Sequence, residues 1–327
     1  MVTGRLGVIP DRHRRTLAEL GERLDLSVGD RDAKRSAFWV MLTLSAVIAV
    51  AGVVGDSTAT VIGAMIVAPL STPILGVGLG ITTGNGRLIG HSLFYVLAGI
   101  ALVVVLGMAF AQVLPNPSSV LTNSQVTGRT SPTLMDLAAA LATGLVGAVA
   151  VARKDVGDVL PGVAIAISLV PPLAVVGVCL GSGAPSLAVG AFVLFASNVV
   201  AMVITATAVL VAAGYAREVG SATGAHRRRA YTVLALVLVA VAIPMVVNSL
   251  SSLWARQIST AAENWLAGTP GAEVTDVTWQ GGTATVAVLG PETLPPLDEL
   301  EKSVDALVPW NPDVQVVHTV GARLVAE

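Results

Sequence analysis

Long apolar runs separated by short charged or glycine-rich joints dominate this 327-residue chain. Each run approaches or exceeds the roughly 20 residues that a helix needs to cross the hydrocarbon core of a bilayer. The runs cover about residues 37–54, 57–82, 88–113, 133–152, 159–181, 186–213 and 230–250. The pattern predicts an all-α polytopic membrane domain over residues 37–250, with about seven spans.

Two of these runs are interrupted by prolines at matching places, 99 residues apart. Residues 63–74 read Gly-Ala-Met-Ile-Val-Ala-Pro-Leu-Ser-Thr-Pro-Ile, and residues 162–173 read Gly-Val-Ala-Ile-Ala-Ile-Ser-Leu-Val-Pro-Pro-Leu. The identical residues that coincide in this alignment are Gly63 and Gly162, Ile66 and Ile165, Leu70 and Leu169, and Pro73 and Pro172. Interrupted apolar segments at corresponding places of two halves indicate the binding site of a transporter.

Two arrangements of the apolar runs compete: seven spans, or five spans with the two proline-broken runs re-entrant. With the N-terminus in the cytoplasm and seven spans, the inner joints carry ten Lys or Arg residues, whereas the outer joints carry only Arg129 and Arg256. With five spans the count becomes eight against four. Because cytoplasmic joints are enriched in Lys and Arg, the charge distribution favours seven spans.

Seven spans give each half of the domain three crossings, and an odd number inverts the second half relative to the first. The halves are then repeats over residues 37–113 and 133–213, related by a pseudo-two-fold axis in the membrane plane, with proline-broken second helices. Several transporter families share this inverted-repeat design. The helix at 230–250 would tether the C-terminal region on the outside.

Both ends of the chain are polar. In the N-terminal segment, residues 1–36, an amphipathic helix is expected over 12–28, where Thr16 and Glu19 form a capping box. This helix would lie either on anionic headgroups or against the cytoplasmic face of the protein. Residues 251–327 are acidic and read helix, strand, strand, helix, strand over about 252–267, 273–279, 283–289, 293–307 and 313–320. They predict a small α/β domain outside the membrane.

The two interruptions supply the candidate ligand-binding residues. At the first, Thr72 precedes Pro73, which predicts Thr72 as the N-cap of a half-helix that begins at Pro73, after a preceding half-helix that ends near Ala68. At the second, Val170-Pro171-Pro172 offers no side-chain cap. Asn198 is the most conspicuous polar residue at that depth and could bond either interruption. The predicted site comprises Pro69, Ser71, Thr72, Pro73, Ser168, Pro171, Pro172 and Asn198.

Residues that are missing from the membrane domain restrict its chemistry. No ionisable side chain lies convincingly at mid-membrane, which argues against proton antiport through a buried carboxylate. No His or Lys lies at a depth from which it could activate Ser71 or Ser168, so we expect no enzyme. With one cysteine, Cys179, the chain can build neither a disulfide framework nor a cysteine metal site. We expect no cofactor and no metal.

The interrupted segments at 63–74 and 162–173 resemble the two motifs of domain-of-unknown-function family 389, a bacterial and archaeal family of hydrophobic membrane proteins. The resemblance covers about residues 37–213. It implies a multi-span inner-membrane protein, and brings no substrate and no catalytic residues.

These observations lead to one main hypothesis and two alternatives. The main hypothesis is a transporter of a small solute or ion in the bacterial plasma membrane, with its site between the interruptions. A channel, or a scaffold or sensor that acts through the acidic C-terminal domain, are the alternatives. The expected partners are the lipid bilayer, the solute or ion and further copies of the chain, since Gly76, Gly80, Gly144 and Gly147 could pack within a protomer or between protomers. No nucleic-acid partner is expected.

Overall fold

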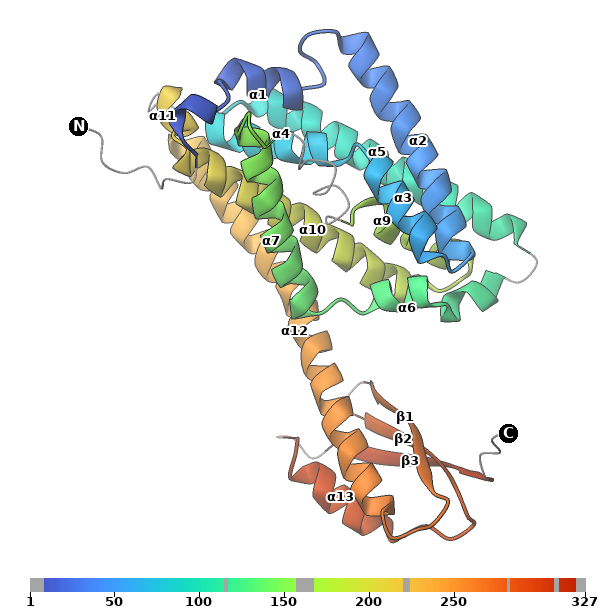
Figure 1. Ribbon diagram of the computed structural model, residues 1–327. Helices are drawn as coiled ribbons and strands as arrows, with labels where there is room; N and C mark the ends of the chain where they lie inside the picture. Colours follow the sequence, from blue (N-terminus) through green and yellow to red (C-terminus); the bar gives the residue numbers. More distant parts are fainter. Residues whose placement is uncertain are drawn as a thin grey trace. The chain divides into compact units, whose positions relative to one another are not determined.

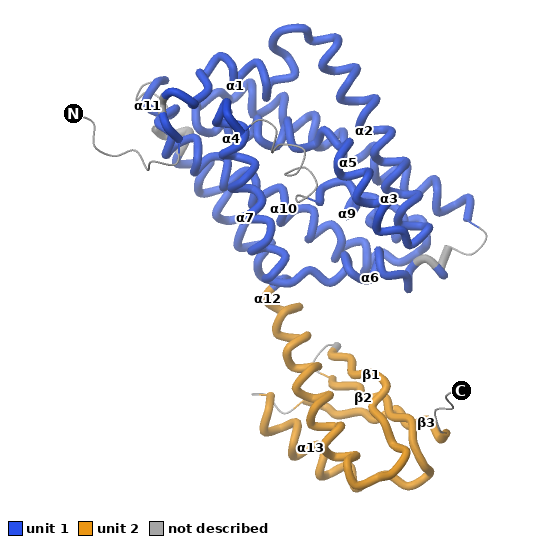
Figure 2. The backbone as a smooth tube through the Cα atoms, viewed as in Figure 1, with its two compact units in different colours: residues 1–245 blue, residues 246–327 orange. Residues whose placement is uncertain are grey.

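The computed structural model describes residues 9–114, 117–156, 168–219, 224–280, 283–308 and 312–321. The chain divides into two compact units, Met1–Met245 and Val246–Glu327 (Figure 2). The first is helical and the second contains a small sheet (Figure 1).

Five helices among the described residues are long and apolar enough to cross a membrane. They are α2 (Arg31–Val54), α5 (Gly86–Val113), α7 (Leu134–Ala152), α10 (Pro185–Ala212) and α12 (Gly224–Leu266). Polar side chains cap the start of two of them: Asp30 accepts from the Ala33 amide, and Asn85 accepts from the Leu88 amide.

Two shorter helices, α3 (Thr58–Val67) and α4 (Ser71–Thr83), form a pair that is bent by 48° and is together apolar enough for a sixth span. A further short apolar helix, α9 (Val170–Gly181), covers the second half of the predicted run at 159–181. The first half of that run, including Gly162 and Ile165, lies mostly outside the described residues.

The N-terminal segment covers one end of unit 1, which we call the α1 end. This segment contains the 3-10 helix η1 (Asp11–His13) and the helix α1 (Leu17–Leu24), and the predicted capping box of Thr16 and Glu19 is present. α1 packs on α4 and buries Leu20 and Leu24. The amphipathic helix therefore packs against the protein, which was one of the two expected arrangements.

Further contacts complete the α1 end. The Arg15 amide donates to the carbonyl of Ala152, the last residue of α7, at 2.9 Å. Tyr215, the first residue of the short helix α11 (Tyr215–Glu218), is fully buried and donates its hydroxyl proton to the Arg15 carbonyl at 2.6 Å. The C-terminal end of α7 and the segment after α10 thus meet at the N-terminal segment.

The opposite end of unit 1, here the α6 end, is organised by α6 (Ser124–Thr130), which follows the 3-10 helix η2 (Pro117–Thr122). The Asp56 carboxylate accepts from the Ser124 hydroxyl at 2.7 Å, so the joint between α2 and α3 is held here. α6 ends three residues before Thr133, the N-cap of α7.

Helices α2 and α7 therefore run in opposite directions between the two ends of unit 1 (Figure 1). The bent pair of α3 and α4 also extends from the α6 end to the α1 end. Thr58, at the start of α3, accepts from Gln125 of α6 at 2.9 Å, whereas α4 contacts α1 and α11.

Unit 2 is a three-stranded sheet covered by helices. β1 (Glu273–Gln280) pairs antiparallel with β2 (Thr283–Gly290), and β2 pairs parallel with β3 (Asp313–Val320). α13 (Leu297–Asp305) makes the crossover that a parallel pair needs. Alternate β2 residues are buried with Ile258 of α12 and Leu300 of α13. The helices and strands follow the predicted order.

One predicted boundary is wrong. The sequence predicts separate helices at 230–250 and 252–267, whereas α12 is continuous over Gly224–Leu266. No glycine or proline interrupts residues 245–266, so nothing in the chain ends the helix there. Pro244 lies inside α12 and removes one backbone donor from it.

Close helix crossings hold the core of unit 1 together. A Cβ atom at Gly107 of α5 would lie 2.9 Å from the Cα of Gly177 of α9, so the two backbones touch. Glycines Gly76, Gly80 and Gly144 also face neighbours within this protomer. In lipid the hydrophobic effect does not drive helices together. Small residues at such crossings allow the close van der Waals packing that does.

We predict that Gly107→Ala lowers the thermal stability of the detergent-solubilised protein, because the new methyl group would overlap the α9 backbone. Gly90→Ala is the matched control on the same helix, since no atom lies within 4 Å of a Cβ at Gly90. The control should keep the wild-type melting temperature or raise it, as alanine favours helix by up to about 1 kcal/mol. Equal melting temperatures for the two variants would contradict the tight crossing.

Candidate functional site

The first interruption lies between α3 and α4. α3 ends at Val67 with Ala68 as its C-cap, close to the predicted end. α4 begins at Ser71 instead of Pro73, with Leu70 as the N-cap residue and no side-chain cap, so the predicted N-cap role of Thr72 is wrong. The reason is that Pro73 occupies the third helical position, where a missing N–H removes no intrahelical bond.

Proline changes the backbone hydrogen bonds near this interruption. Pro69 has no N–H, so the Met65 carbonyl lacks its usual helical donor. The Pro69 carbonyl accepts from the Thr72 amide at 3.2 Å. The Ala64 carbonyl accepts from the buried Ser45 hydroxyl of α2 at 2.8 Å, a contact that no sequence pattern indicates.

The second interruption ends where α9 begins, at Val170. As predicted, no side chain caps this helix, and Pro171 and Pro172 occupy its first turn. Asn198 of α10 is buried and donates from Nδ2 to the Ser168 carbonyl at 2.7 Å. The Ser168 hydroxyl oxygen is buried and has no hydrogen-bond partner within the described part of the chain.

The two interruptions occupy corresponding places in the helical framework. α4 and α9 begin at Ser71 and Val170, and α5 and α10 begin at Gly86 and Pro185; both separations are 99 residues. α5 and α10 are each 28 residues long, so their ends correspond as well. α4 packs against both α5 and α10, and so does α9.

The closest crossings repeat with the same spacing. Gly78 of α4 meets Ala206 of α10, where an added Cβ would lie 2.7 Å from the alanine Cβ. Gly177 of α9 meets Gly107 of α5. Adding 99 to 78 and to 107 gives 177 and 206, so one contact maps onto the other.

Asn198 has a counterpart that carries no polar group. The position 99 residues earlier is Gly99 of α5, which faces Leu70 of the first interruption. Asn198 and Gly99 therefore occupy equivalent positions, and each contacts one interruption. The Asn198 amide donates to the Ser168 carbonyl, whereas Gly99 lies in apolar contact with Leu70.

The predicted site residues fall into two groups. Asn198 and Ser168 are joined by a hydrogen bond, whereas within the described residues no hydrogen bond joins Ser71 or Thr72 to that pair. Pro73, Pro171 and Pro172 are buried; Pro69, Ser71, Thr72 and Ser168 are partly buried. Leu70 and Leu169, one in each interruption, belong to the same apolar core.

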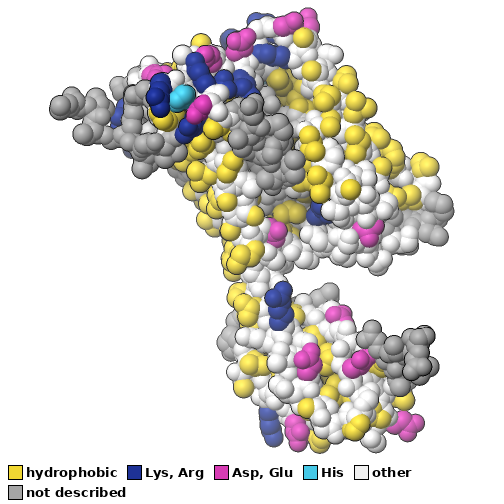
Figure 3. Space-filling model, viewed as in Figure 1, with side chains coloured by type: hydrophobic (Ala, Val, Ile, Leu, Met, Phe, Trp, Pro, Cys, Tyr) yellow, Lys and Arg dark blue, Asp and Glu magenta, His cyan; other side chains and the backbone are white. Residues whose placement is uncertain are grey.

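Charged side chains lie at the ends of unit 1. Figure 3 shows Lys and Arg side chains gathered over the α1 end. Lys154 donates to Glu19 at 2.8 Å and lowers the pKa of that carboxyl, and Arg153 lowers the pKa of Asp155 to about 2. These carboxylates are therefore charged at neutral pH, and their contribution to stability is lost only as the pH falls through these lowered values.

A protein-family model matches the part of the chain that contains both proline interruptions. The model of the family described as "Domain of unknown function (DUF389)" matches residues 65–204. This stretch of the chain is therefore similar to the DUF389 family. It contains both proline interruptions, so the resemblance drawn from the two motifs is confirmed.

The chain is also similar to an archaeal protein. An uncharacterized protein of Methanocaldococcus jannaschii is 33% identical over 175 residues, which are 54% of this chain and 53% of that protein. The chain thus spans about half the length of this relative. No solved structure matches the chain.

We predict that Asn198→Leu destabilises the protein by about 1 kcal/mol, the size of a hydrogen bond between membrane helices. The substitution keeps the volume but leaves the Ser168 carbonyl without its donor. Ser197→Ala is the matched control, because the Ser197 hydroxyl bonds only to Leu194 of its own helix. Reversible unfolding in mixed micelles measures both, and a loss for Asn198→Leu no larger than for the control would exclude the proposed link.

Proposed function

We propose that residues 37–113 and 133–213 are inverted repeats with three spans each, and that the protein crosses the membrane seven times. The opposite directions of α2 and α7 support this arrangement, because two re-entrant segments would leave these helices parallel. The crossing of unit 1 by the α3–α4 pair, from Thr58 to the contacts of α4 with α1, supports it as well. The 99-residue spacing of helix bounds and close contacts is what a duplicated unit predicts.

We further propose that the α1 end faces the cytoplasm of a plasma membrane and that the C-terminal domain lies outside. The Lys and Arg side chains at the α1 end support this orientation, since cytoplasmic joints are enriched in them (Figure 3). At the α6 end, Arg129 is the basic residue of α6.

We infer that the protein is a transporter of a small solute or ion. The observation that carries this proposal is the pair of uncapped helix starts inside the bundle, at Ser71 and Val170. The amides at a helix start carry partial positive charge, so these two starts favour a neutral or anionic solute. The freed carbonyls at the end of α3 keep a sodium-type contact open as part of the same site.

The hydroxyl groups of Ser71 and Thr72 are the side chains best placed to bind such a solute. Both are partly buried in the first turn of α4. Binding at this place would exchange water for the solute at the amides of α4, and movement of one repeat against the other would expose the site alternately to each side.

Osmotic permeation tests the proposal. The full-length protein in vesicles of phosphatidylethanolamine and phosphatidylglycerol is challenged with a panel of small neutral solutes and sodium salts of small anions, and reswelling is followed by light scattering. We predict faster reswelling than in protein-free vesicles for at least one solute, and at least a tenfold slower rate for Thr72→Val. Thr83→Val is the matched control, because its hydroxyl bonds Leu79 of the same helix.

Three results separate the alternatives. A rate that Thr72→Val and Pro73→Ala leave unchanged would place the pathway elsewhere. Unitary conductance in bilayer recordings would identify a channel. A full panel without reswelling, together with a cellular phenotype that depends on residues 251–327, would favour the scaffold or sensor.

A further inference from the structure

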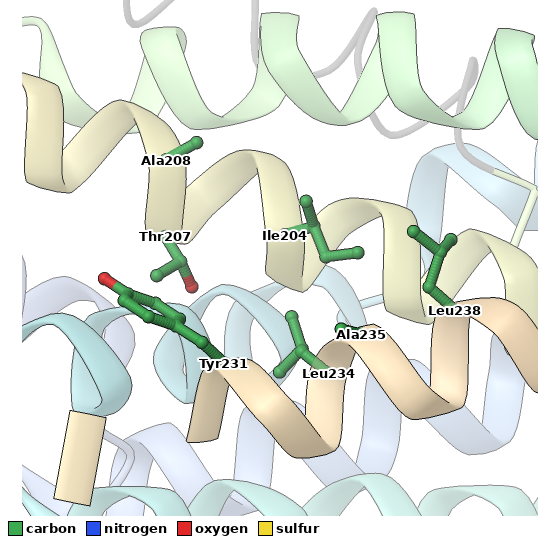
Figure 4. A pocket seen from close by; sticks show the side chains of 7 residues that line it. All are labelled: Ile204, Thr207, Ala208, Tyr231, Leu234, Ala235 and Leu238. Atoms are coloured by element: carbon green, nitrogen blue, oxygen red, sulfur yellow. The ribbon is translucent and has the colours of Figure 1, made fainter. Parts of the chain in front are cut away.

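A groove of about 360 Å³ runs between α10 and the first part of α12, in unit 1 (Figure 4). Its size falls within the range of small-molecule sites, about 300–1,000 Å³. Side chains of Thr207 and Tyr231 lie together toward one end, and aliphatic side chains line the remainder (Figure 4). The full lining consists of Ile204, Thr207, Ala208, Tyr231, Leu234, Ala235 and Leu238.

α12 is the most sparsely packed of the five long helices in the described part of the chain. In its most apolar stretch 11% of the residues are buried, against 28–56% in the other four long helices. Farther along, Val241 and Met245 of α12 are buried together with Leu137 of α7. The groove lies on the N-terminal side of this cluster, at the level of Tyr231.

The lining offers little to a polar ligand. The Thr207 hydroxyl donates to the Val203 carbonyl of its own helix at 2.7 Å. Ile204, Ala208, Leu234, Ala235 and Leu238 present only hydrocarbon. This part of the groove therefore suits an apolar occupant such as an aliphatic chain.

The polar end of the groove is basic. Arg228 is one turn before Tyr231, and positions 228, 231, 235 and 238 share one face of α12. Long side chains on a helix point toward its N-terminus, so Arg228 extends beyond the Tyr231 end of the groove. Tyr231 is 39% exposed, and tyrosine is enriched at the headgroup level of membranes.

We propose that this groove binds an anionic phospholipid, with one acyl chain along α10 and α12 and its phosphate beside Arg228 and the Tyr231 hydroxyl. A hydrocarbon groove that ends in a guanidinium matches a ligand with an apolar chain and an anionic head. A zwitterionic lipid presents a compensating positive charge and matches it less well. The proposal is independent of the transport function and of the site at the proline interruptions.

Native mass spectrometry of the full-length protein tests the lipid site, with phosphatidylglycerol and phosphatidylcholine of the same chain length as probes. We expect the first phosphatidylglycerol to bind at least fivefold more tightly than phosphatidylcholine. Arg228→Gln should remove this preference, and Ala235→Trp should weaken the binding of both lipids by filling the groove.

Two controls on α12 carry the same chemical changes on the opposite face of the helix. Arg229→Gln removes a neighbouring charge, and Ala240→Trp adds the same bulk at an exposed position. Both should bind phosphatidylglycerol as the wild type does.

The proposal is overturned if Arg228→Gln and Arg229→Gln lower the affinity equally, because the lipid would then respond only to net charge. It is also overturned if Ala235→Trp converts a dimer into a monomer without changing lipid affinity, because a second copy of the chain would then cover the groove. Circular dichroism of each variant checks that α12 remains helical.

Discussion

A backbone carbonyl or amide inside lipid must have a partner, and prolines in two apolar segments of this chain deny partners to several of them. Two polar side chains of unit 1 donate to backbone carbonyls near these prolines. Ser45 of α2 donates to the Ala64 carbonyl, which also accepts from the Ala68 amide, and Asn198 of α10 donates to the Ser168 carbonyl. The amides at the starts of α4 and α9 receive no side-chain cap. These uncapped helix starts are the physical basis for the proposed ligand site beside them.

The framework that holds the interruptions depends on small residues. α4 and α9 approach α10 and α5 through Gly78 and Gly177, where a side chain on either glycine would meet the facing helix. Such close contact fixes the two short helices firmly although each has fewer than fifteen residues. α1 packs on α4 at one end of unit 1, and α6 contacts α9 at the other end. Both short helices are therefore also held at the ends of unit 1.

Much of this arrangement could be predicted from sequence because apolar length and prolines are local signals. The bounds of α5, α7 and α10 lie within two residues of the predicted runs, and the interruption at Ala68 lies where Pro69 requires it. The start of α4 was misplaced because Thr72-Pro73 resembles a cap, whereas Leu70 already has a helical backbone. The Ser45 contact escaped prediction because it depends on how α2 packs against α3. The continuity of α12 differs from the prediction, because the apolar run ends at Leu250 whereas the helix does not.

The central claim, that the two halves point in opposite directions through the membrane, is tested most directly by cysteine accessibility. In a Cys179→Ala background, single variants Asp32→Cys at the start of α2, Ala59→Cys at the start of α3, and Ser131→Cys and Asp155→Cys on either side of α7 place a thiol near each end of these helices. A membrane-impermeant maleimide should label positions 32 and 155 from one side only, and positions 59 and 131 from the other. Labelling of positions 59 and 155 from the same side would contradict the account.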